Sequence, residues 1–529
     1  MSGRLSLAAL ALAAALLSRA QAQTLTPLVN APPADGIVYG YLMTNGQVLL
    51  QGGNLSDWYT LTPDANGSYI DGTWAQVASL PAPYAPDATS GAVLPDGRVL
   101  VTGGEYNGGS FALDTESAVY DPAQDSWKVF AGPKGWTDIG DSPATILANG
   151  QLLLGEKTTQ ALALLDARTL TWNLLAPSGK ADVNAEEGYT LMPDGSVLTT
   201  DVTNAPNAER LDTATWTWTS LGSTQVNLKF TWQGINARPI PWHYRGKTYY
   251  YTPAGEIGPN ILRPDGTVFA AGAINTVPKR AYYAHTAVYV PGATPGGTGT
   301  WHVGPNFQHN DDAGDQFAVL LPNGNVLVQA NVGGYDKTRA ERAQRIATLA
   351  RRHIAFAANS CPGVPPFHLY EFNGKSLTLE PTTLNTCGVS PNMLVLPDGG
   401  TLIGGFTIYT STGAPLPAWA PTIATVPATL THGTTATLSG TQLTGLSQAN
   451  AFGDEFGAPT NYPLVRVTNT ATGHVVYCRT HDWSNAGVAT GATRVTTAFD
   501  IPATIETGAS TLEVVANGIA SAPVAVTLQ

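Results

Sequence analysis

Acidic residues recur at one position in this chain, eight to ten residues before a repeated Asp-Gly or Asn-Gly turn. They are Asp87, Asp141, Glu186 or Glu187, Glu256 and Asp315, with Asp138, Asp311 and Asp312 slightly earlier. If the turns are equivalent in a repeating fold, these carboxylates converge, and their repulsion requires a cation, a shared proton or backbone N–H donors. Alternatively, each acid caps its own loop.

A partial ring of oxygen donors suits Ca²⁺ or Mg²⁺ better than copper. The candidate ligands for a divalent cation are Asp141, Glu187 and Asp315, with Ca²⁺ as the candidate ion. Nothing in the sequence identifies a cofactor outright, and a copper site is not expected.

Aromatic and basic groups lie in the longer segments between the turns, and such groups above carboxylates suit a polyhydroxylated ligand. His309 is the candidate for acid–base catalysis, unless it only bonds its neighbours. We predict binding of carbohydrate or another small polar ligand. The candidate ligand-binding residues are Asp87, Trp136, Asp138, Asp141, Glu186, Glu187, Trp242, Glu256, Tyr283, His309, Asp312 and Asp315. A glycan-cleaving enzyme with two catalytic carboxylates is an open alternative.

The elements that position these residues are repeated hairpins. The turn glycines are Gly46, Gly97, Gly150, Gly195, Gly266, Gly324 and Gly399, with gaps of 51, 53, 45, 71, 58 and 75 residues. Each turn lies between two apolar runs, which predicts a hairpin. Strand-only repeats of this length indicate a seven-bladed β-propeller.

The second half of each repeat also recurs, as in VYDPAQDSW at 119–127 and LLDARTLTW at 164–172. The repeat has a hairpin ending in Gly-Gly, then a Tyr-Asp-Pro turn, then a tryptophan. This order resembles kelch repeats, over roughly residues 36–415. We interpret the repeated tryptophans, Trp74, Trp127, Trp172, Trp218 and Trp301, as packing residues between blades.

A different unit begins at the proline-rich PAWAP (417–421). Its short alternating strands over 421–529 predict an immunoglobulin-like β-sandwich. A kelch propeller followed by this sandwich, with the ending VVANGIASAPVAVTLQ, resembles the galactose oxidase and glyoxal oxidase family. The fold class is therefore all-β, with a propeller at 23–416 and a sandwich at 417–529.

That resemblance implies copper held by two tyrosines and two histidines, one tyrosine being cross-linked to cysteine. Val389 and Ser390 stand where the family has Tyr-His, and no histidine lies between Ala451 and Gly473. No cysteine precedes Cys361. We therefore expect no copper-radical oxidase activity; a copper oxidase with displaced ligands, for example at Tyr283 and His285, is the alternative.

Arg4, the apolar run over 5–17 and Ala20-Gln21-Ala22 predict a signal peptide at 1–22 and a secreted protein, extracellular or periplasmic. The net charge of −12 disfavours nucleic acid, and no later run is long enough to span a membrane. We expect a monomer.

Two further features concern the insertions and the cysteines. The composition of the segment 337–353 predicts a basic helix. This helix is either a solvated flap or a docking site in an extracellular protein-interaction module. Cys361 and Cys387 are the expected disulfide in an oxidising compartment, and Cys478 is predicted to be a buried thiol.

Overall fold

A computed structural model describes residues 23–33, 36–229, 239–251, 255–274, 284–294, 296–332, 367–384 and 391–529. Within these ranges the regular structure is β, apart from the 3₁₀ turn Pro417–Trp419. The all-β prediction is confirmed. No helix in the described part of the chain is long and apolar enough to cross a membrane.

Each of the repeated turns joins the first two strands of a separate antiparallel sheet. The turn glycines have φ between 77° and 89°, the left-handed region that favours glycine. The first sheets are β2 (Ile37–Leu42), β3 (Val48–Gly52), β4 (Trp58–Thr62) and β5 (Thr73–Val77); β7 (Ser90–Val93), β8 (Val99–Thr102), β11 (Glu116–Asp121) and β12 (Ser126–Ala131); and β13 (Ala144–Ile146), β14 (Leu152–Gly155), β15 (Leu162–Asp166) and β16 (Thr171–Leu174).

The later sheets follow the same plan with longer connections. They are β17 (Thr190–Leu191), β18 (Val197–Thr200), β19 (Asn207–Asp212) and β20 (Thr217–Ser223); β23 (Asn260–Leu262), β24 (Val268–Ile274), β25 (Ala284–Val290) and β26 (Thr300–Val303); β27 (Ala318–Leu320), β28 (Val326–Asn331), β29 (Phe367–Phe372) and β30 (Leu377–Leu384); and β31 (Met393–Val395), β32 (Thr401–Ile403) and β33 (Thr407–Thr410).

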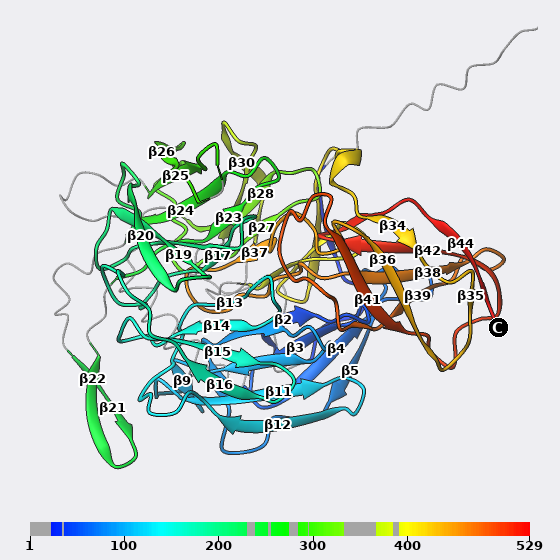
Figure 1. Ribbon diagram of the computed structural model, residues 1–529, viewed down its shortest axis with the longest axis horizontal. Coiled ribbons are helices and arrows are strands. Elements are labelled where there is room, and N and C mark those ends of the chain that lie inside the picture. The colour runs from blue at the N-terminus through cyan, green and yellow to red at the C-terminus, as the bar shows by residue number, and fades with distance from the viewer. Residues whose placement is uncertain are drawn as a thin grey trace, which may run out of the picture.

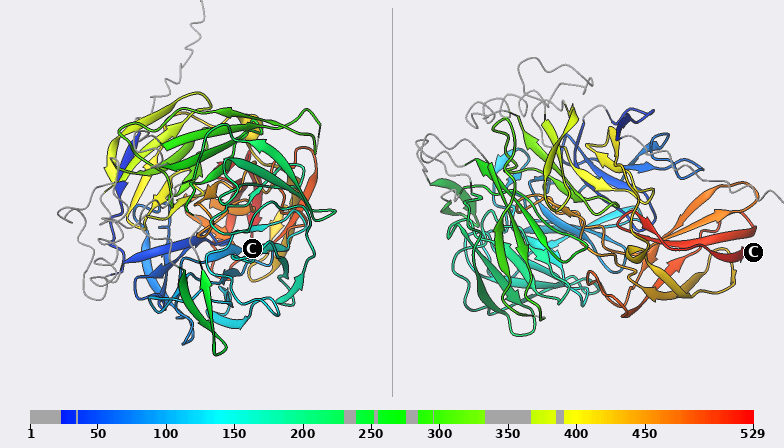
Figure 2. Two further views of the ribbon diagram at one scale, coloured as in Figure 1. Left: turned by 90° about the vertical axis from the view of Figure 1, so that its left-hand side faces the viewer. Right: turned by 90° about the horizontal axis from the view of Figure 1, so that it is seen from above.

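The first strand of each sheet contacts the first strand of the next, from β2 through to β31. Viewed along their common axis, the sheets surround a centre (Figure 2, left). The N-terminal strand β1 (Thr24–Pro27) completes the last sheet by antiparallel pairing with β33, with Thr24 opposite Thr410. The propeller-type fold is confirmed, and the strand that completes the last sheet, which the repeats left undetermined, is β1.

The repeated tryptophans lie within or against the hydrophobic cores of the sheets. Trp218 and Trp301 are buried, and Trp127 packs with its ring centre 5.0 Å from that of Trp58 and 5.2 Å from that of Tyr120. Trp74 and Trp172 are partly buried against the same core. Their interpretation as packing residues is confirmed.

The C-terminal unit contains two sheets on one core, at the end of the molecule away from the hairpin of β21 (Ile240–Tyr244) and β22 (Lys247–Tyr251) (Figure 1). Their strands are β34 (Thr422–Thr425), β36 (Thr435–Thr441), β41 (Arg494–Asp500) and β40 (Thr480–His481); and β35 (Thr429–Leu430), β44 (Val524–Leu528), β42 (Gly508–Ala516), β38 (Leu464–Asn469) and β39 (Val475–Cys478). Cys478 is a buried free thiol, as predicted, and burial raises its pKa to about 12.

One loop of the C-terminal unit, residues 449–462, enters the ring of sheets, and we call it the axial loop. Its strand β37 (Asn450–Ala451) pairs with β27, among the strands of the ring (Figure 1). Asn450 donates to the Met393 carbonyl at 2.6 Å, and the Tyr462 hydroxyl donates to the Leu42 carbonyl. The loop therefore joins strands from opposite ends of the propeller sequence.

Several predictions concern residues outside the described ranges. They are the signal peptide at 1–22, Tyr283, the basic segment 337–353, the Cys361–Cys387 disulfide, Val389 and Ser390.

Candidate functional site

A buried lysine, Lys157, lies among carboxylates from three separate segments. Its Nζ is 2.5 Å from Asp141 Oδ1, 2.9 Å from Glu186 Oε1 and 3.9 Å from Asp454 Oδ2. Lys157 follows β14, Asp141 precedes β13, Glu186 precedes β17, and Asp454 belongs to the axial loop. The ring and the C-terminal unit therefore build this site together.

Two further acids, Glu105 and Glu455, interact with the same group, and we call all six residues the axial cluster. Burial, followed by the charge of Asp141, raises the pKa of Glu105 well above its usual range. Burial also raises the pKa of Glu455 and Asp454, whose carboxyls interact with each other.

Burial raises the pKa of Asp141 to about 6, although the Lys157 ammonium opposes that rise. Five acids thus surround one lysine. Burial favours the protonated form of these acids, whereas the Lys157 ammonium favours the ionised form of Asp141 and Glu105. A carboxyl accepts hydrogen bonds in either form and donates one when it is protonated.

An aromatic rim adjoins the axial cluster. Tyr106 is 37% exposed, its hydroxyl hydrogen-bonds the Glu105 carboxyl, and its ring centre is 6.0 Å from that of Phe111. In the strands β6 (Pro86–Asp87) and β9 (Tyr106–Asn107), Asp87 pairs with Tyr106. This rim places exposed aromatic surface next to the carboxyls.

The hairpin of β21 (Ile240–Tyr244) and β22 (Lys247–Tyr251) packs near this rim. Tyr244 and Tyr249 lie against a small cluster that also includes Phe111. The hairpin projects on the side of the ring away from the C-terminal unit (Figure 1). The predicted residue Trp242 lies in β21, and the structure describes its backbone only.

A second buried cluster surrounds Lys180, whose Nζ is 2.8 Å from Asp182 Oδ1, 2.8 Å from Glu187 Oε2 and 3.3 Å from Glu209 Oε2. The neighbouring Asp201 is buried, and burial with the charges of Asp182 and Glu209 raises its pKa to about 7. The sequence placed Glu187 with Asp141 and Asp315 as cation ligands. The structure instead puts Glu187 in this separate Lys180 cluster.

Other predicted residues have structural partners. Asp138 is buried and accepts hydrogen bonds from the Thr158 N–H at 3.1 Å and the Thr158 hydroxyl at 2.9 Å. Asp312 accepts one from the Gly314 N–H at 2.9 Å. Trp136 is 5% exposed and belongs to the hydrophobic core. For these residues the geometry matches loop capping and packing rather than ligand contact.

Three other predicted residues, Glu256, His309 and Asp315, precede strands β23 and β27. The charge of Asp315 raises the pKa of Glu455, which places Asp315 near the axial cluster. Glu256 is half-buried ahead of β23. His309 is exposed and belongs to a different group of residues, described below. Of the predicted acids, Asp141 and Glu186 therefore meet directly at one lysine.

Sequence reasoning missed the residues that complete the axial cluster: Glu105, Lys157, Asp454 and Glu455. A signal was present, because LLLGEK carries lysine directly after the strand where other repeats read VTGG or LQGG. GDEF in the C-terminal unit also places two acids where the resembling family has a histidine loop.

The donors of the axial cluster do not fit the copper that the family resemblance implies. Its described members are carboxyls and an ammonium without an imidazole, whereas copper favours imidazole nitrogens and carboxylates suit Ca²⁺ or Mg²⁺. His285, the alternative ligand, has its Nδ1 2.8 Å from Asn306 Oδ1.

A hard cation would meet an internal competitor in this cluster. One oxygen each from Asp141, Glu186 and Asp454 lies within 4.8 Å of the others, a spacing that a metal ion could use. The Lys157 ammonium already lies 2.5 to 3.9 Å from these three carboxylates and supplies positive charge there.

No family model and no curated protein matches the chain. Among solved structures, a fungal alcohol oxidase of the AA5 family in complex with copper is 13% identical, covering 97% of this chain and 99% of its own, with a TM-score of 0.45. A streptogramin B lyase is 13% identical over 74% of this chain and 98% of its own, with a TM-score of 0.42. The extracellular domain of a putative one component system from B. thetaiotaomicron is 10% identical over 97% and 58%, with a TM-score of 0.41. No function is transferred from these likenesses.

Proposed function

We propose that this protein is secreted and binds a carbohydrate, or a similar polyhydroxylated ligand, at the axial cluster, without copper-radical oxidase chemistry. The observation that carries the proposal is the position of the Lys157 cluster beside the exposed ring of Tyr106. Few other ligand classes need both acceptor carboxyls and an aromatic face.

Carboxylates accept hydrogen bonds from hydroxyl groups, and the protonated acids of the cluster donate them. Because acids outnumber the lysine, the site disfavours phosphorylated or uronate-containing ligands. The rings of Tyr106 and Phe111 supply an apolar surface for the C–H face of a sugar. A neutral or amine-bearing saccharide fits these properties best.

Binding to an array of neutral, amino and acidic glycans tests the proposal. We expect neutral or amino glycans to bind, and Tyr106→Ala to weaken the binding at least about tenfold, or about 1.4 kcal/mol. Leu174→Ala, which changes an exposed residue of β16, is the matched control. Absence of glycan binding by the wild-type protein would refute the proposal, as would full binding by both Tyr106→Ala and Glu455→Gln.

A glycan-cleaving enzyme on the same site is the second candidate. The observation that favours it is the pKa of Asp141, about 6, which suits a general acid beside other carboxyls. This candidate would be supported if the wild-type protein released reducing ends from a bound glycan and Asp141→Asn lost that activity but kept glycan binding. Binding without release would reject it.

A further inference from the structure

A histidine, an aspartate and a tyrosine form a hydrogen-bonded group in the sheet of β27 to β30, separate from the axial cluster. His368 Nδ1 is 2.5 Å from Asp311 Oδ2, and the Tyr370 hydroxyl donates to the same oxygen at 2.5 Å. His368 and Tyr370 are two residues apart on β29, so both side chains lie on one face of that strand. Asp311 is fully buried.

This arrangement fixes the imidazole of His368. When Nδ1 donates its proton to the Asp311 carboxylate, Nε2 becomes the acceptor nitrogen on the far side of the ring. Among the described residues, Nε2 has no hydrogen-bond or ion-pair partner, and the His368 side chain is 16% exposed. The ring is therefore oriented by a buried acid and keeps one available nitrogen.

A second imidazole lies beside the first. The ring centres of His309 and His368 are 6.3 Å apart, with an angle of 61° between their planes. His309 and the following Asn310 have φ values of 57° and 59°, a left-handed conformation that costs a non-glycine residue about 1 kcal/mol. Backbone strain of this kind is often retained where it positions a functional group.

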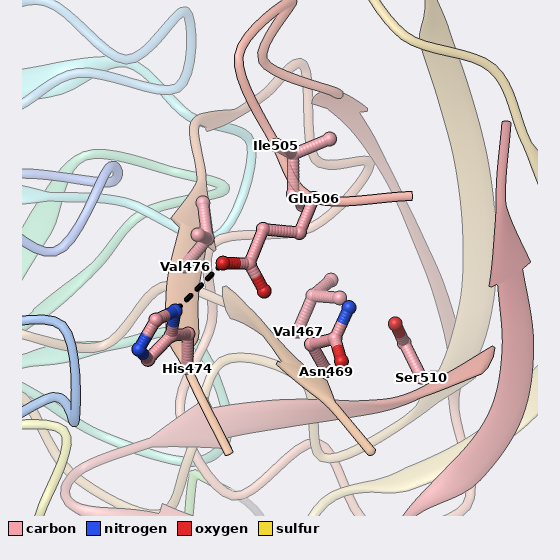
Figure 3. Close-up of a pocket in the computed structure, with 7 residues that line it drawn as sticks. All are labelled: Val467, Asn469, His474, Val476, Ile505, Glu506 and Ser510. Carbon is pink, nitrogen blue, oxygen red and sulfur yellow. Dashed lines mark hydrogen bonds and ion pairs between the residues drawn. The ribbon is translucent and has the colours of Figure 1, made fainter. Parts of the chain in front are cut away.

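Two other histidines in the described ranges lack this combination. His474 also has its Nδ1 held by a carboxylate, 2.7 Å from Glu506 Oε1, but it lines a cavity of about 10 Å³ whose other labelled residues include no imidazole (Figure 3). His481 has both ring nitrogens engaged, by Asp482 and Asp500. His474 thus provides a natural comparison: a carboxylate-bound imidazole without a second histidine.

We propose that His309 and His368 bind a divalent transition-metal ion, with Zn²⁺ as the probe ion, and that Asp311 orients His368 for this role. A metal-bound histidine almost always donates its other nitrogen to a carboxylate or carbonyl, as His368 does to Asp311. Imidazole pairs suit Zn²⁺, Cu²⁺ and Ni²⁺, whereas a general-base dyad needs only one histidine.

The spacing of the rings permits this binding. A metal–nitrogen bond is about 2.1 Å long, and the ring centre lies farther from the metal than the nitrogen does. Two imidazoles that bind one metal ion therefore have ring centres at most roughly 6.5 Å apart. The observed 6.3 Å is within that limit. A tetrahedral angle at the metal requires ring centres about 5.3 Å apart, so the exposed His309 ring would have to approach His368 by about 1 Å. Two protein ligands leave the remaining positions to water or a small ligand.

Calorimetric titration of the full-length, untagged and chelator-treated protein with Zn²⁺ tests the proposal. We expect one equivalent to bind, and His309→Ala or His368→Ala to weaken the binding at least about tenfold. Asp311→Asn, which leaves both imidazoles in place, is expected to weaken it about 10- to 100-fold. The matched control His474→Ala retains wild-type affinity.

Two further readouts separate loss of ligands from loss of fold. Titration with Co²⁺ gives visible absorption bands whose intensity is expected to fall in both histidine variants. Because His309 is exposed, His309→Ala is expected to keep the wild-type melting temperature. No stoichiometric Zn²⁺ binding by the wild-type protein, or wild-type affinity in His309→Ala/His368→Ala, would overturn the proposal.

Discussion

Lys157 and Lys180 each lie within a group of buried carboxyls that would otherwise repel one another. An ammonium on a side chain differs from a bound ion because it cannot be removed by a chelator. Of the three ways to offset the repulsion of converging acids, the structure shows an internal cation, together with acids whose pKa values are raised.

Replacement of Lys157 tests how much the internal cation stabilises the fold. Lys157→Met leaves Asp141 and Glu186 without their positive partner in a buried site. We expect a loss of about 3–5 kcal/mol in the free energy of unfolding at neutral pH, measured by urea denaturation. Lys375→Met, at an exposed position, is the control; equal stability of both variants would contradict this role.

Asp201 predicts a pH dependence of stability. Its folded pKa of about 7 lies above the ordinary 3.8, so between these values the folded protein holds a proton that the unfolded chain has lost. This contribution is present at low pH and is lost as the pH rises through 7. We expect Asp201→Asn to gain about 2 kcal/mol relative to wild type between about pH 5 and pH 8, measured by denaturation at both values. If Asp201→Asn and wild type differed in unfolding free energy by the same amount at pH 5 and pH 8, the prediction would be contradicted.

The spacing before the turns placed Asp141 in one candidate group with Glu186 or Glu187, and left loop capping as the alternative. Counting back a fixed distance from each turn identifies one position per repeat. It therefore misses Lys157, which follows the second strand, and Asp454, which comes from another unit. It also cannot separate adjacent residues: Glu186 and Glu187 point to different clusters because neighbouring side chains diverge.

At the scale of elements, the hairpins were predictable because each Asp-Gly or Asn-Gly turn is a local signal. The axial loop was not, because its pairing with β27 depends on contact between segments far apart in sequence. Its path is held by side-chain bonds from Asn450 and Tyr462 to two sheets, and the residue before the loop, Gln448, donates from Nε2 to Thr145 Oγ1 of a third sheet at 2.7 Å.

Asn450 is the residue whose loss should most directly release the axial loop. It donates to the Met393 carbonyl and accepts from the Ala458 N–H at 2.8 Å, both in buried surroundings. We expect Asn450→Ala to cost about 1–3 kcal/mol per unsatisfied group and to weaken glycan binding, since Asp454 and Glu455 lie on this loop. Thermal unfolding and the glycan assay measure the two effects. Unchanged glycan binding by a destabilised Asn450→Ala variant would show that the axial loop does not contribute to the binding site.

At the scale of the molecule, the propeller and the C-terminal unit share polar contacts at partly buried positions. Arg479 donates to the Asp96 carbonyl at 2.6 Å, and the Asp482 N–H donates to the Pro95 carbonyl at 2.6 Å. Both acceptors lie in the turn that joins β7 and β8. The two units are therefore expected to unfold as one.

Removal of the C-terminal unit tests this coupling. A chain that ends at residue 416 loses the axial loop, leaving β27 without β37 and Lys157 without Asp454. We expect this truncated protein to aggregate or to melt well below the full chain, measured by size-exclusion chromatography and thermal scanning. A monomer with the melting temperature of the full chain would show that the propeller is independent.

The pairing of β1 with β33 sets an order of events during biosynthesis. As the chain leaves the ribosome, β1 emerges before the other strands, and its partner β33 follows several hundred residues later. Until then the growing sheets present open edges that can pair with other chains. A cell that makes this protein must shield those edges for the whole time of synthesis, so its yield should depend on chaperone supply more than on the stability of the finished fold.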